Sequence, residues 1–301
     1  MAKDVTLRQF RYFVAAAQNG QFSMAAAVEH VSQSAITNAV LALEEALGTR
    51  LFIRLPQGVE LTPEGQDFLN HARHVLESVR DALHKPPFRA HSLSGTVRIA
   101  ASYTLLGYFL PDLLARFRST YPEIELDLRD LDRPAIEAAV QAGEVDLGVA
   151  LLSNVERHSR FGHHVLIRSR RQLWVAPTHP LMQLGAPTLR DIARYPYIQL
   201  TVDEGERSTL RYWKKKRLAP NIAFRTSSME ALRGLVAHGF GVTILSDMVF
   251  RPWSLEGKRI DARAVHDAIP QMEAGMLWHP SVPLNDPARA LQQFLIHACG
   301  S

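Results

Sequence analysis

Four short, uncharged polar side chains gather at the start of a segment with helical periodicity: Gln33, Ser34, Thr37 and Asn38. Amide and hydroxyl groups donate and accept hydrogen bonds without carrying charge, which is the chemistry that contacts base edges in a nucleic-acid groove. The opposite face of the segment carries an apolar stripe spaced for burial, formed by Ile36, Val40, Leu43 and Leu47. The polar side chains are therefore expected to point away from the core and toward a partner.

The helix that carries these side chains is expected to follow Ser32, its N-cap, and to end at Gly48. A shorter helix before it is expected to start at Phe22 and Ser23, with Ser23 as N-cap, and its alanine run lets two backbones approach closely. The short gap between them predicts a helix-turn-helix, whose second helix presents its first residues to the major groove. An ordinary helical hairpin with a solvated polar face is the alternative.

A further helix and a hairpin are expected on either side of this pair. Thr6 and Gln9 have the spacing of a capping box and Asn19-Gly20 is typical of a helix end, so a first helix should lie between them. The segment RLFIRLPQGVELT (50–62) predicts two strands joined by a turn at 55–58. A hairpin placed after a recognition helix would act as a wing. It would bring three side chains to phosphate or to the minor groove: Arg50, Arg54 and Gln57.

The stretch FSMAAAVEHVSQSAITNAVLALEEALGTRLFIRLPQGVELTPEG (22–65) resembles the winged helix-turn-helix of the LysR-type transcriptional regulators. The resemblance continues in outline to the C-terminus. It implies double-stranded DNA with an inverted-repeat operator as partner, a homodimer or homotetramer, and contact with RNA polymerase. The family usually has Pro at the place of Ser34 and a longer polar residue near Thr37-Asn38, so the operator of a relative cannot be transferred. The expected DNA-binding residues are Ser32, Gln33, Ser34, Thr37, Asn38, Arg50, Arg54 and Gln57.

The next segment predicts a long helix over 63–85, because Pro63 suits the first helical position and an apolar seam follows. The seam consists of Phe68, Ala72, Val75, Leu76, Val79 and Leu83. In the resembled family this is the linker helix that pairs two subunits, and a helix that lies on its own domain is the alternative. Pro86-Pro87 breaks it, so residues 86–95 are expected to form a hinge.

Residues 96–301 alternate between strand and helix patterns, which predicts parallel sheets covered by helices. The whole chain is therefore expected to be an α/β multidomain protein, with a DNA-binding domain at 1–62 and an effector-binding domain at 96–301. The latter resembles the two-lobed, periplasmic-binding-protein-like domain of the same family. Lobe I would comprise 96–170 and 272–301, and lobe II 171–271. Such lobes bind a small-molecule effector in the cleft between them.

Candidate effector contacts are polar residues at strand ends and helix starts. Ser102 and Thr104 would open a helix with free backbone N–H groups, which suits a carboxylate. Ser227 and Glu230 have the spacing of a capping box. If Asp203 and Glu204 lined the cleft, an amine-bearing effector would be favoured instead. The expected effector-binding residues are Ser102, Thr104, Arg129, Thr201, Ser227 and Ser228, although plain helix capping explains each serine equally well.

Composition limits the remaining function classes. The 301 residues carry a net charge of +4, but residues 1–87 contain eight Lys or Arg against nine Asp or Glu, so a nucleic-acid contact there depends on a few well-placed cations. No apolar run is long enough for a membrane span, and with Cys299 as the one cysteine a cytoplasmic protein is expected. No catalytic, metal or cofactor motif is present, so an enzyme is disfavoured. A constitutive DNA-binding protein or repressor without an effector response remains the other alternative.

Overall fold

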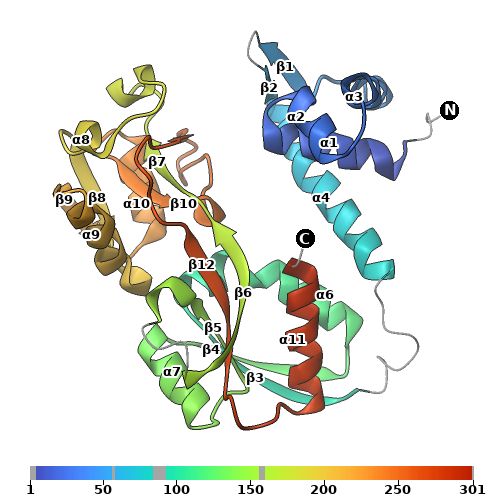
Figure 1. Cartoon of the computed structure of the whole chain (residues 1–301), viewed down its shortest axis with the longest axis vertical. Coiled ribbons are helices and arrows are strands. Elements are labelled where there is room, and N and C mark those ends of the chain that lie inside the picture. The colour runs from blue at the N-terminus through green and yellow to red at the C-terminus, as the bar shows by residue number, and fades with distance from the viewer. Residues whose placement is uncertain (1–4, 56–57, 84–92, 156–159, 300–301) are drawn as a thin grey trace. The chain divides into compact units, whose positions relative to one another are not determined.

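The computed structural model describes residues 5–55, 58–83, 93–155 and 160–299. The chain divides into two units, Met1–Pro87 and Phe88–Ser301, each with its own hydrophobic core (Figure 1). Gln57 and residues 86–92 of the expected hinge lie outside the described residues.

The first unit is a helix-turn-helix followed by a hairpin and a longer helix. Its elements are α1 (Leu7–Asn19), α2 (Phe22–Val28), α3 (Gln33–Leu47), β1 (Phe52–Leu55), β2 (Gly58–Leu61) and α4 (Pro63–Leu83). The expected capping box at Thr6 and Gln9 is confirmed, and so is the N-cap Ser32, whose Oγ accepts from the Ala35 N–H at 3.2 Å. Gly20 and Gly48 end α1 and α3 in the left-handed region, at φ 66° and 67°. Local signals therefore fixed both ends of the recognition helix.

The start of α2 differs from the expectation. Gln21 is its N-cap and Phe22 its first residue, so the assignment of Ser23 as N-cap is wrong. The Phe22 ring makes an edge contact with Phe52, with centroids 5.5 Å apart, and this packing sets where the helix begins. A long-range aromatic contact thus outweighs a local capping preference.

Helix α4 begins against the core of its own unit. Phe68 lies 5.4 Å from Phe10 and 5.1 Å from Phe13, measured between ring centroids, and Leu69 and Ala72 are buried in the same cluster. Further along, Val75 is 37% exposed. The first part of the expected seam therefore packs within the unit, whereas Val75 lies at the surface.

Lobe I of the second unit is built on a five-stranded sheet in the order β4-β3-β5-β12-β6. Helices α6 and α11 cover one face and α7 covers the other (Figure 1). Strands β3, β4 and β5 are parallel, whereas β12 runs antiparallel to β5 and β6. The elements are β3 (Gly95–Ala101), α5 (Tyr103–Tyr108), α6 (Leu110–Thr120), β4 (Ile124–Asp130), α7 (Arg133–Gln141), β5 (Leu147–Leu151), η2 (Leu152–Asn154), β6 (Gly162–Ser169), β12 (Met272–Trp278) and α11 (Asp286–Cys299).

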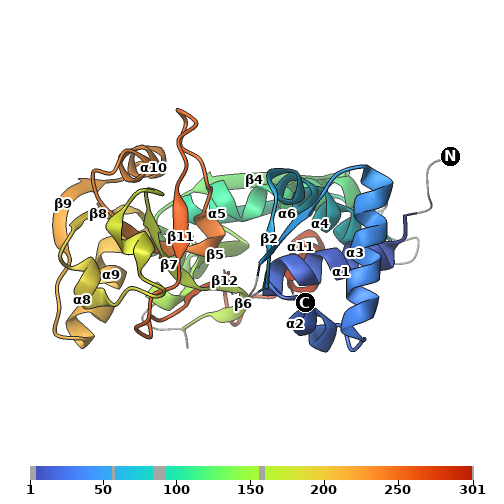
Figure 2. The same cartoon turned by 90° about the horizontal axis from the view of Figure 1, so that it is seen from above.

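Lobe II contains the intervening residues. Strand β7 lies between β10 and β11 in an antiparallel sheet, and β8 pairs with β9 in parallel. Helices α9 and α10 lie on opposite sides of β7 and β8, each over its own apolar cluster (Figure 2). The elements are β7 (Arg171–Val175), η4 (Pro180–Gln183), α8 (Leu189–Ile192), β8 (Pro196–Leu200), η5 (Val202–Glu204), α9 (Gly205–Lys215), β9 (Asn221–Thr226), α10 (Met229–Ala237), β10 (Thr243–Ser246), η6 (Asp247–Val249) and β11 (Asp261–Arg263).

The alternation of strands and helices is confirmed, and β3, β4 and β5 are parallel as expected, but β12 and the β10-β7-β11 sheet depart from the expected parallel arrangement. The chain crosses from lobe I to lobe II between β6 and β7 and returns into β12. Because β12 must re-enter the first sheet from the opposite end, it runs antiparallel to its neighbours.

Candidate nucleic-acid interface and effector cavity

The polar start of α3 is exposed, as its amphipathic pattern predicts. Gln33, Ser34 and Asn38 are exposed and Thr37 is half-buried, whereas Ile36 and Leu43 are fully buried. The hydroxyl groups are partly committed within the helix, because Thr37 Oγ1 donates to the Gln33 carbonyl at 3.0 Å and Ser32 Oγ lies 2.9 Å from Ser34 Oγ. Among the described residues, the side-chain amides of Gln33 and Asn38 form no hydrogen bond with the protein. These two amides have their full capacity for an outside partner.

Leu41, an apolar residue on the same surface, was not predicted from the sequence to lie there. Leu41 is 45% exposed and follows Thr37 by one helical turn. The sequence spacing could have indicated this exposure, since Leu41 does not fall on the buried stripe of Ile36, Val40 and Leu43. An exposed leucine beside two amides adds an apolar contact to the polar surface.

The wing is anchored to the turn between α1 and α2. The Val59 N–H donates to the Gly20 carbonyl at 2.8 Å, and a Cβ on Gly58 would lie 2.3 Å from the same oxygen. Arg54 is exposed on β1, and its guanidinium lies over the Phe22 ring at 5.9 Å. The hairpin is therefore held in place relative to the helix-turn-helix by its backbone.

The cations of this unit are unequally available. Arg11 forms an ion pair with Glu29, at 2.6 Å from Nε to Oε2. Arg50 and Arg54 are exposed and form no ion pair with a described residue. Both arginines follow α3 in the sequence and can meet phosphate oxygens.

The second unit encloses a cavity of about 50 Å³ between its lobes. Lobe I contributes Thr104 from α5, Leu151 from β5 and Met272 from β12. Lobe II contributes more of the wall, including Arg171, Gln199, Asp203, Thr209 and Ser246. Ligand pockets for drug-sized molecules are roughly 300–1,000 Å³, so the lobes are closed around a space for only a few atoms.

Asp203 holds the lobes together at this cavity. Its Oδ2 accepts from the Thr104 N–H at 2.7 Å, and its carbonyl accepts from Asn154 Nδ2 at 2.8 Å. Its backbone is in the left-handed region, at φ 50° and ψ 37°, which is uncommon for a residue other than glycine. The N–H groups expected to be free at the start of α5 are thus partly used by a carboxylate of the protein itself.

A second connection between the lobes runs through a buried arginine. Arg233 on α10 is 2% exposed, and its guanidinium lies over the Tyr108 ring of α5 at 5.2 Å. Its Nη1 also contacts the Tyr108 hydroxyl at 3.3 Å and pairs with Glu230, while Nη2 donates to the Val249 carbonyl at 2.8 Å. Arg233 therefore joins three elements from both lobes.

The expected effector residues are only partly brought together. Thr104 lines the cavity, and Ser102 is buried beside it with an Oγ that has no partner in the described structure. Arg129 is exposed on β4 and pairs with Asp127 at 2.8 Å, while Thr201 and Ser227 are also exposed. Ser228 is the N-cap of α10 and accepts from the Ala231 N–H at 3.1 Å, so the capping box expected at Ser227 and Glu230 is wrong: the cap lies one residue later and its N3 residue is an alanine.

Five polar residues of the cavity wall were not selected from the sequence as effector contacts: Arg171, Gln199, Ser208, Thr209 and Ser246. Gln199 could have been selected, since it is an amide within the otherwise apolar strand YIQL. Arg171 belongs to the basic run RSRR, and nothing in the sequence distinguishes it from the neighbouring arginines. Asp203, considered as a feature that would favour an amine, does line the cavity.

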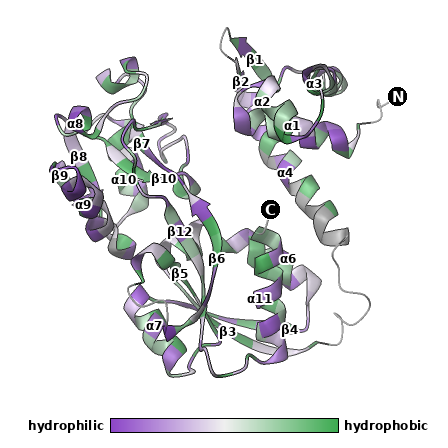
Figure 3. Ribbon diagram, viewed as in Figure 1, coloured by the Kyte–Doolittle hydropathy of each residue, from purple (hydrophilic) through white to green (hydrophobic). Residues whose placement is uncertain are grey.

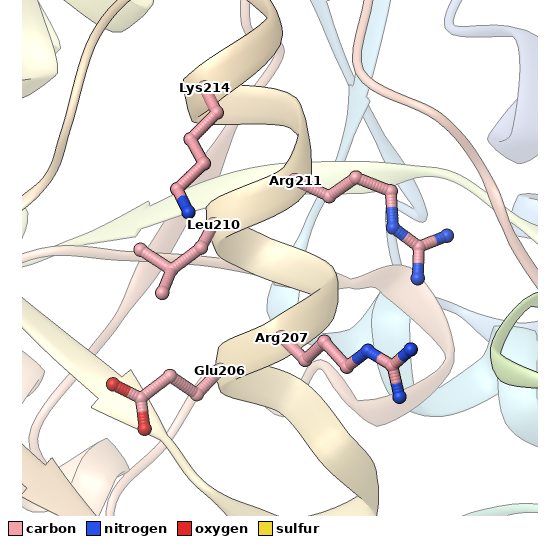
Figure 4. Close-up of a pocket in the computed structure, with 5 residues that line it drawn as sticks. All are labelled: Glu206, Arg207, Leu210, Arg211 and Lys214. Carbon is pink, nitrogen blue, oxygen red and sulfur yellow. The ribbon is translucent and has the colours of Figure 1, made fainter.

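The basic helix α9 presents an open surface of a different kind. Arg207 and Arg211 extend to one side of the helix, and Glu206, Leu210 and Lys214 extend to the other (Figure 4). Figure 3 shows α9 as largely hydrophilic. Lys216, just beyond it, forms an ion pair with Asp267 at 2.9 Å. This surface is therefore a solvated, basic helix face.

Two features are absent from the described part of the chain. No helix in it is long and apolar enough to cross a membrane. No group of three or more His, Cys, Asp or Glu residues there is arranged to hold a metal ion.

Comparison with known proteins agrees with this architecture. Residues 7–66 match the family described as bacterial regulatory helix-turn-helix protein, lysR family, and residues 90–300 match the LysR substrate binding domain. YnfL, an uncharacterized HTH-type transcriptional regulator of Escherichia coli, is 29% identical over 98% of this chain and 99% of its own.

Solved structures give the same result. HinK, a LysR family transcriptional regulator from Pseudomonas aeruginosa, is 26% identical, with a TM-score of 0.62 over 97% of this chain and 98% of its own. Full-length CbnR, solved with its target DNA, shares the fold at 22% identity, with a TM-score of 0.55 over 97% of this chain and 99% of its own. With a helix-turn-helix unit and a two-lobed α/β unit both matched, the chain belongs to the LysR family of transcriptional regulators, which are DNA-binding proteins and not enzymes.

Proposed function

We propose that α3 enters the major groove of an operator half-site and that Gln33 and Asn38 contact base edges there. The exposure of these two amides, free of hydrogen bonds with described residues, is the observation that carries the proposal. An amide side chain pairs best with adenine, through one donor and one acceptor. Leu41 lies on the same surface and suits the methyl group of thymine.

The phosphate contacts in this proposal come from Arg50 and Arg54. Both are exposed, and Arg54 is carried by the wing strand β1, next to α2. Neutralised phosphates release counterions, so operator affinity should fall steeply as salt rises. The partner is an inverted repeat, bound by a homodimer or a pair of dimers joined through α4 from Val75 onward.

The second unit is proposed to sense a small carboxylate in the cavity between the lobes. Arg171 supplies a cation in the wall, where it can meet a carboxylate. Binding changes the closure of the lobes, and this changes the geometry of the assembly on DNA and its contact with RNA polymerase. Such a shift requires the ligand to favour one arrangement over the other by differential contact.

Gln33→Ala is expected to weaken binding to the operator by roughly 10- to 100-fold, since a good base contact contributes about 1–3 kcal/mol. Binding to an unrelated duplex should be unchanged, because Gln33 carries no charge. Fluorescence anisotropy with both duplexes, using the operator located by footprinting, measures the two affinities.

Arg54→Gln is the matched comparison for this variant. It should weaken binding to both duplexes equally and lower the slope of log affinity against log salt by about 1. If Gln33→Ala also weakened both duplexes equally, Gln33 would not contact bases and the proposed orientation of α3 would be wrong.

A further inference from the structure

A buried hydrogen-bond acceptor in the cavity wall has no partner within the described structure. Gln199 is 2% exposed, and its Oε1 forms no hydrogen bond. Its Nε2 donates to the Leu200 carbonyl at 2.6 Å, which fixes the orientation of the amide, because the reversed amide would bring two oxygens together. An unpaired acceptor at a cavity wall is costly unless something in the cavity donates to it. A simple carboxylate cannot do so, since it has only acceptor atoms.

A cation lines the same cavity. Arg171 on β7 has no carboxylate partner among the described residues; its Nη1 donates to the Pro270 carbonyl at 2.9 Å, and its guanidinium lies over the Tyr212 ring at 5.7 Å. Desolvation by burial lowers the pKa of Arg171, which remains a cation at neutral pH. A half-buried cation without a matching anion favours an anionic group on the ligand.

An anion also lines the cavity. Asp203 Oδ2 accepts from the Thr104 N–H, and Oδ1 forms no hydrogen bond with a described residue. A carboxylate and an unpaired amide oxygen together favour a positively charged donor over a neutral hydroxyl. The wall therefore presents acceptors for an ammonium group as well as a cation for a carboxylate.

The size of the cavity restricts the rest of the ligand. Its volume is about 50 Å³, and one water requires roughly 10–15 Å³ measured in this way. Only a molecule of a few heavy atoms fits without further opening of the lobes.

We propose that the effector is a small α-amino acid, whose ammonium group donates to Gln199 Oε1 and Asp203 and whose carboxylate meets Arg171. This inference rests on the proposed sensing function of the cavity and narrows its ligand class. It explains why a single cavity carries one cation, one anion and one neutral acceptor.

Titration calorimetry on the full-length chain tests the proposal with three matched pairs: glycine and acetate, alanine and propionate, serine and 3-hydroxypropionate. Each pair differs by the ammonium group alone. At least one amino acid should bind, and its partner acid should bind roughly 10- to 100-fold more weakly, because it leaves Gln199 Oε1 unpaired. Lactate should resemble propionate more than alanine, since its hydroxyl has no charge for Asp203.

Two variants separate this contact from general damage to the fold. Gln199→Met and Asp203→Asn should reduce the preference for the amino acid over its acid by about 10-fold each. Lys214→Gln, on the exposed face of α9, should leave that preference unchanged. The ratio of two affinities is the quantity compared, so a partial loss of folded protein does not imitate the result.

The outcomes distinguish the two proposals. Equal binding of an amino acid and its acid, or equal binding of alanine and lactate, would overturn the ammonium assignment and leave a carboxylate sensor. If none of the six compounds binds, the amino-acid proposal is wrong. An operator footprint that also stays the same with every carboxylate would support the constitutive DNA-binding protein instead.

Discussion

Gly65→Ala is expected to unfold the DNA-binding unit at physiological temperature while the second unit remains folded. A Cβ at this position would lie 2.0 Å from the Leu51 carbonyl oxygen. That carbonyl cannot move away easily, because it accepts from the Thr62 N–H at 3.0 Å and Leu51 is fully buried. Overpacking against fixed backbone costs about 3 kcal/mol, which is a large part of the stability of a small domain.

The measurement is thermal unfolding together with operator binding. A loss of about 3 kcal/mol lowers Tm by roughly 15 °C in a domain of this size, and operator binding should disappear with it. Gly185→Ala is the control, since a Cβ there meets no atom within 4 Å. A Gly65→Ala protein with unchanged Tm and normal operator affinity would show that α4 can shift away from Leu51.

Arg233→Ala is expected to destabilise the second unit by about 3 kcal/mol, because it removes a fully buried side chain and leaves the Val249 carbonyl without its donor. For a unit of this length the loss corresponds to a fall in Tm of roughly 10 °C. Differential scanning calorimetry on the full-length chain measures it.

Arg251→Ala provides the comparison for this variant. The Arg251 guanidinium lies over the same Tyr108 ring, at 5.7 Å, but Arg251 is exposed. Its replacement should change stability by no more than about 0.5 kcal/mol. Equal effects of the two substitutions would mean that stacking on Tyr108, and not burial of Arg233, provides the stabilisation.

Local signals account for the parts of the fold that the sequence predicted well. Ser32 and Gly48 mark the ends of α3 because the capping serine and the left-handed glycine act within one helical turn. The start of α10 was displaced by one residue because Ser227 and Ser228 are chemically equal. Burial of Met229, which is 1% exposed, decides which serine precedes the helix.

The existence of a cavity between the lobes could be predicted, but the residues that line it and their contacts could not. The resemblance to the LysR-type regulators implied a cleft between two lobes, yet the contact from Asp203 to Thr104 joins residues 99 positions apart. No periodicity or spacing encodes such a contact. The direction of β12 is equally invisible in its sequence, because strand periodicity is the same in parallel and antiparallel sheets.

The paired connections across the two lobes also set how the protein would respond in time. Asp203 joins them at Thr104 and Asn154, and Arg233 joins them at Tyr108. Under the proposed sensing function, a ligand that has to part these contacts would bind no faster than the lobes open, once the ligand is abundant. The response time of such a receptor would be set by the opening of its lobes and not by diffusion of the metabolite.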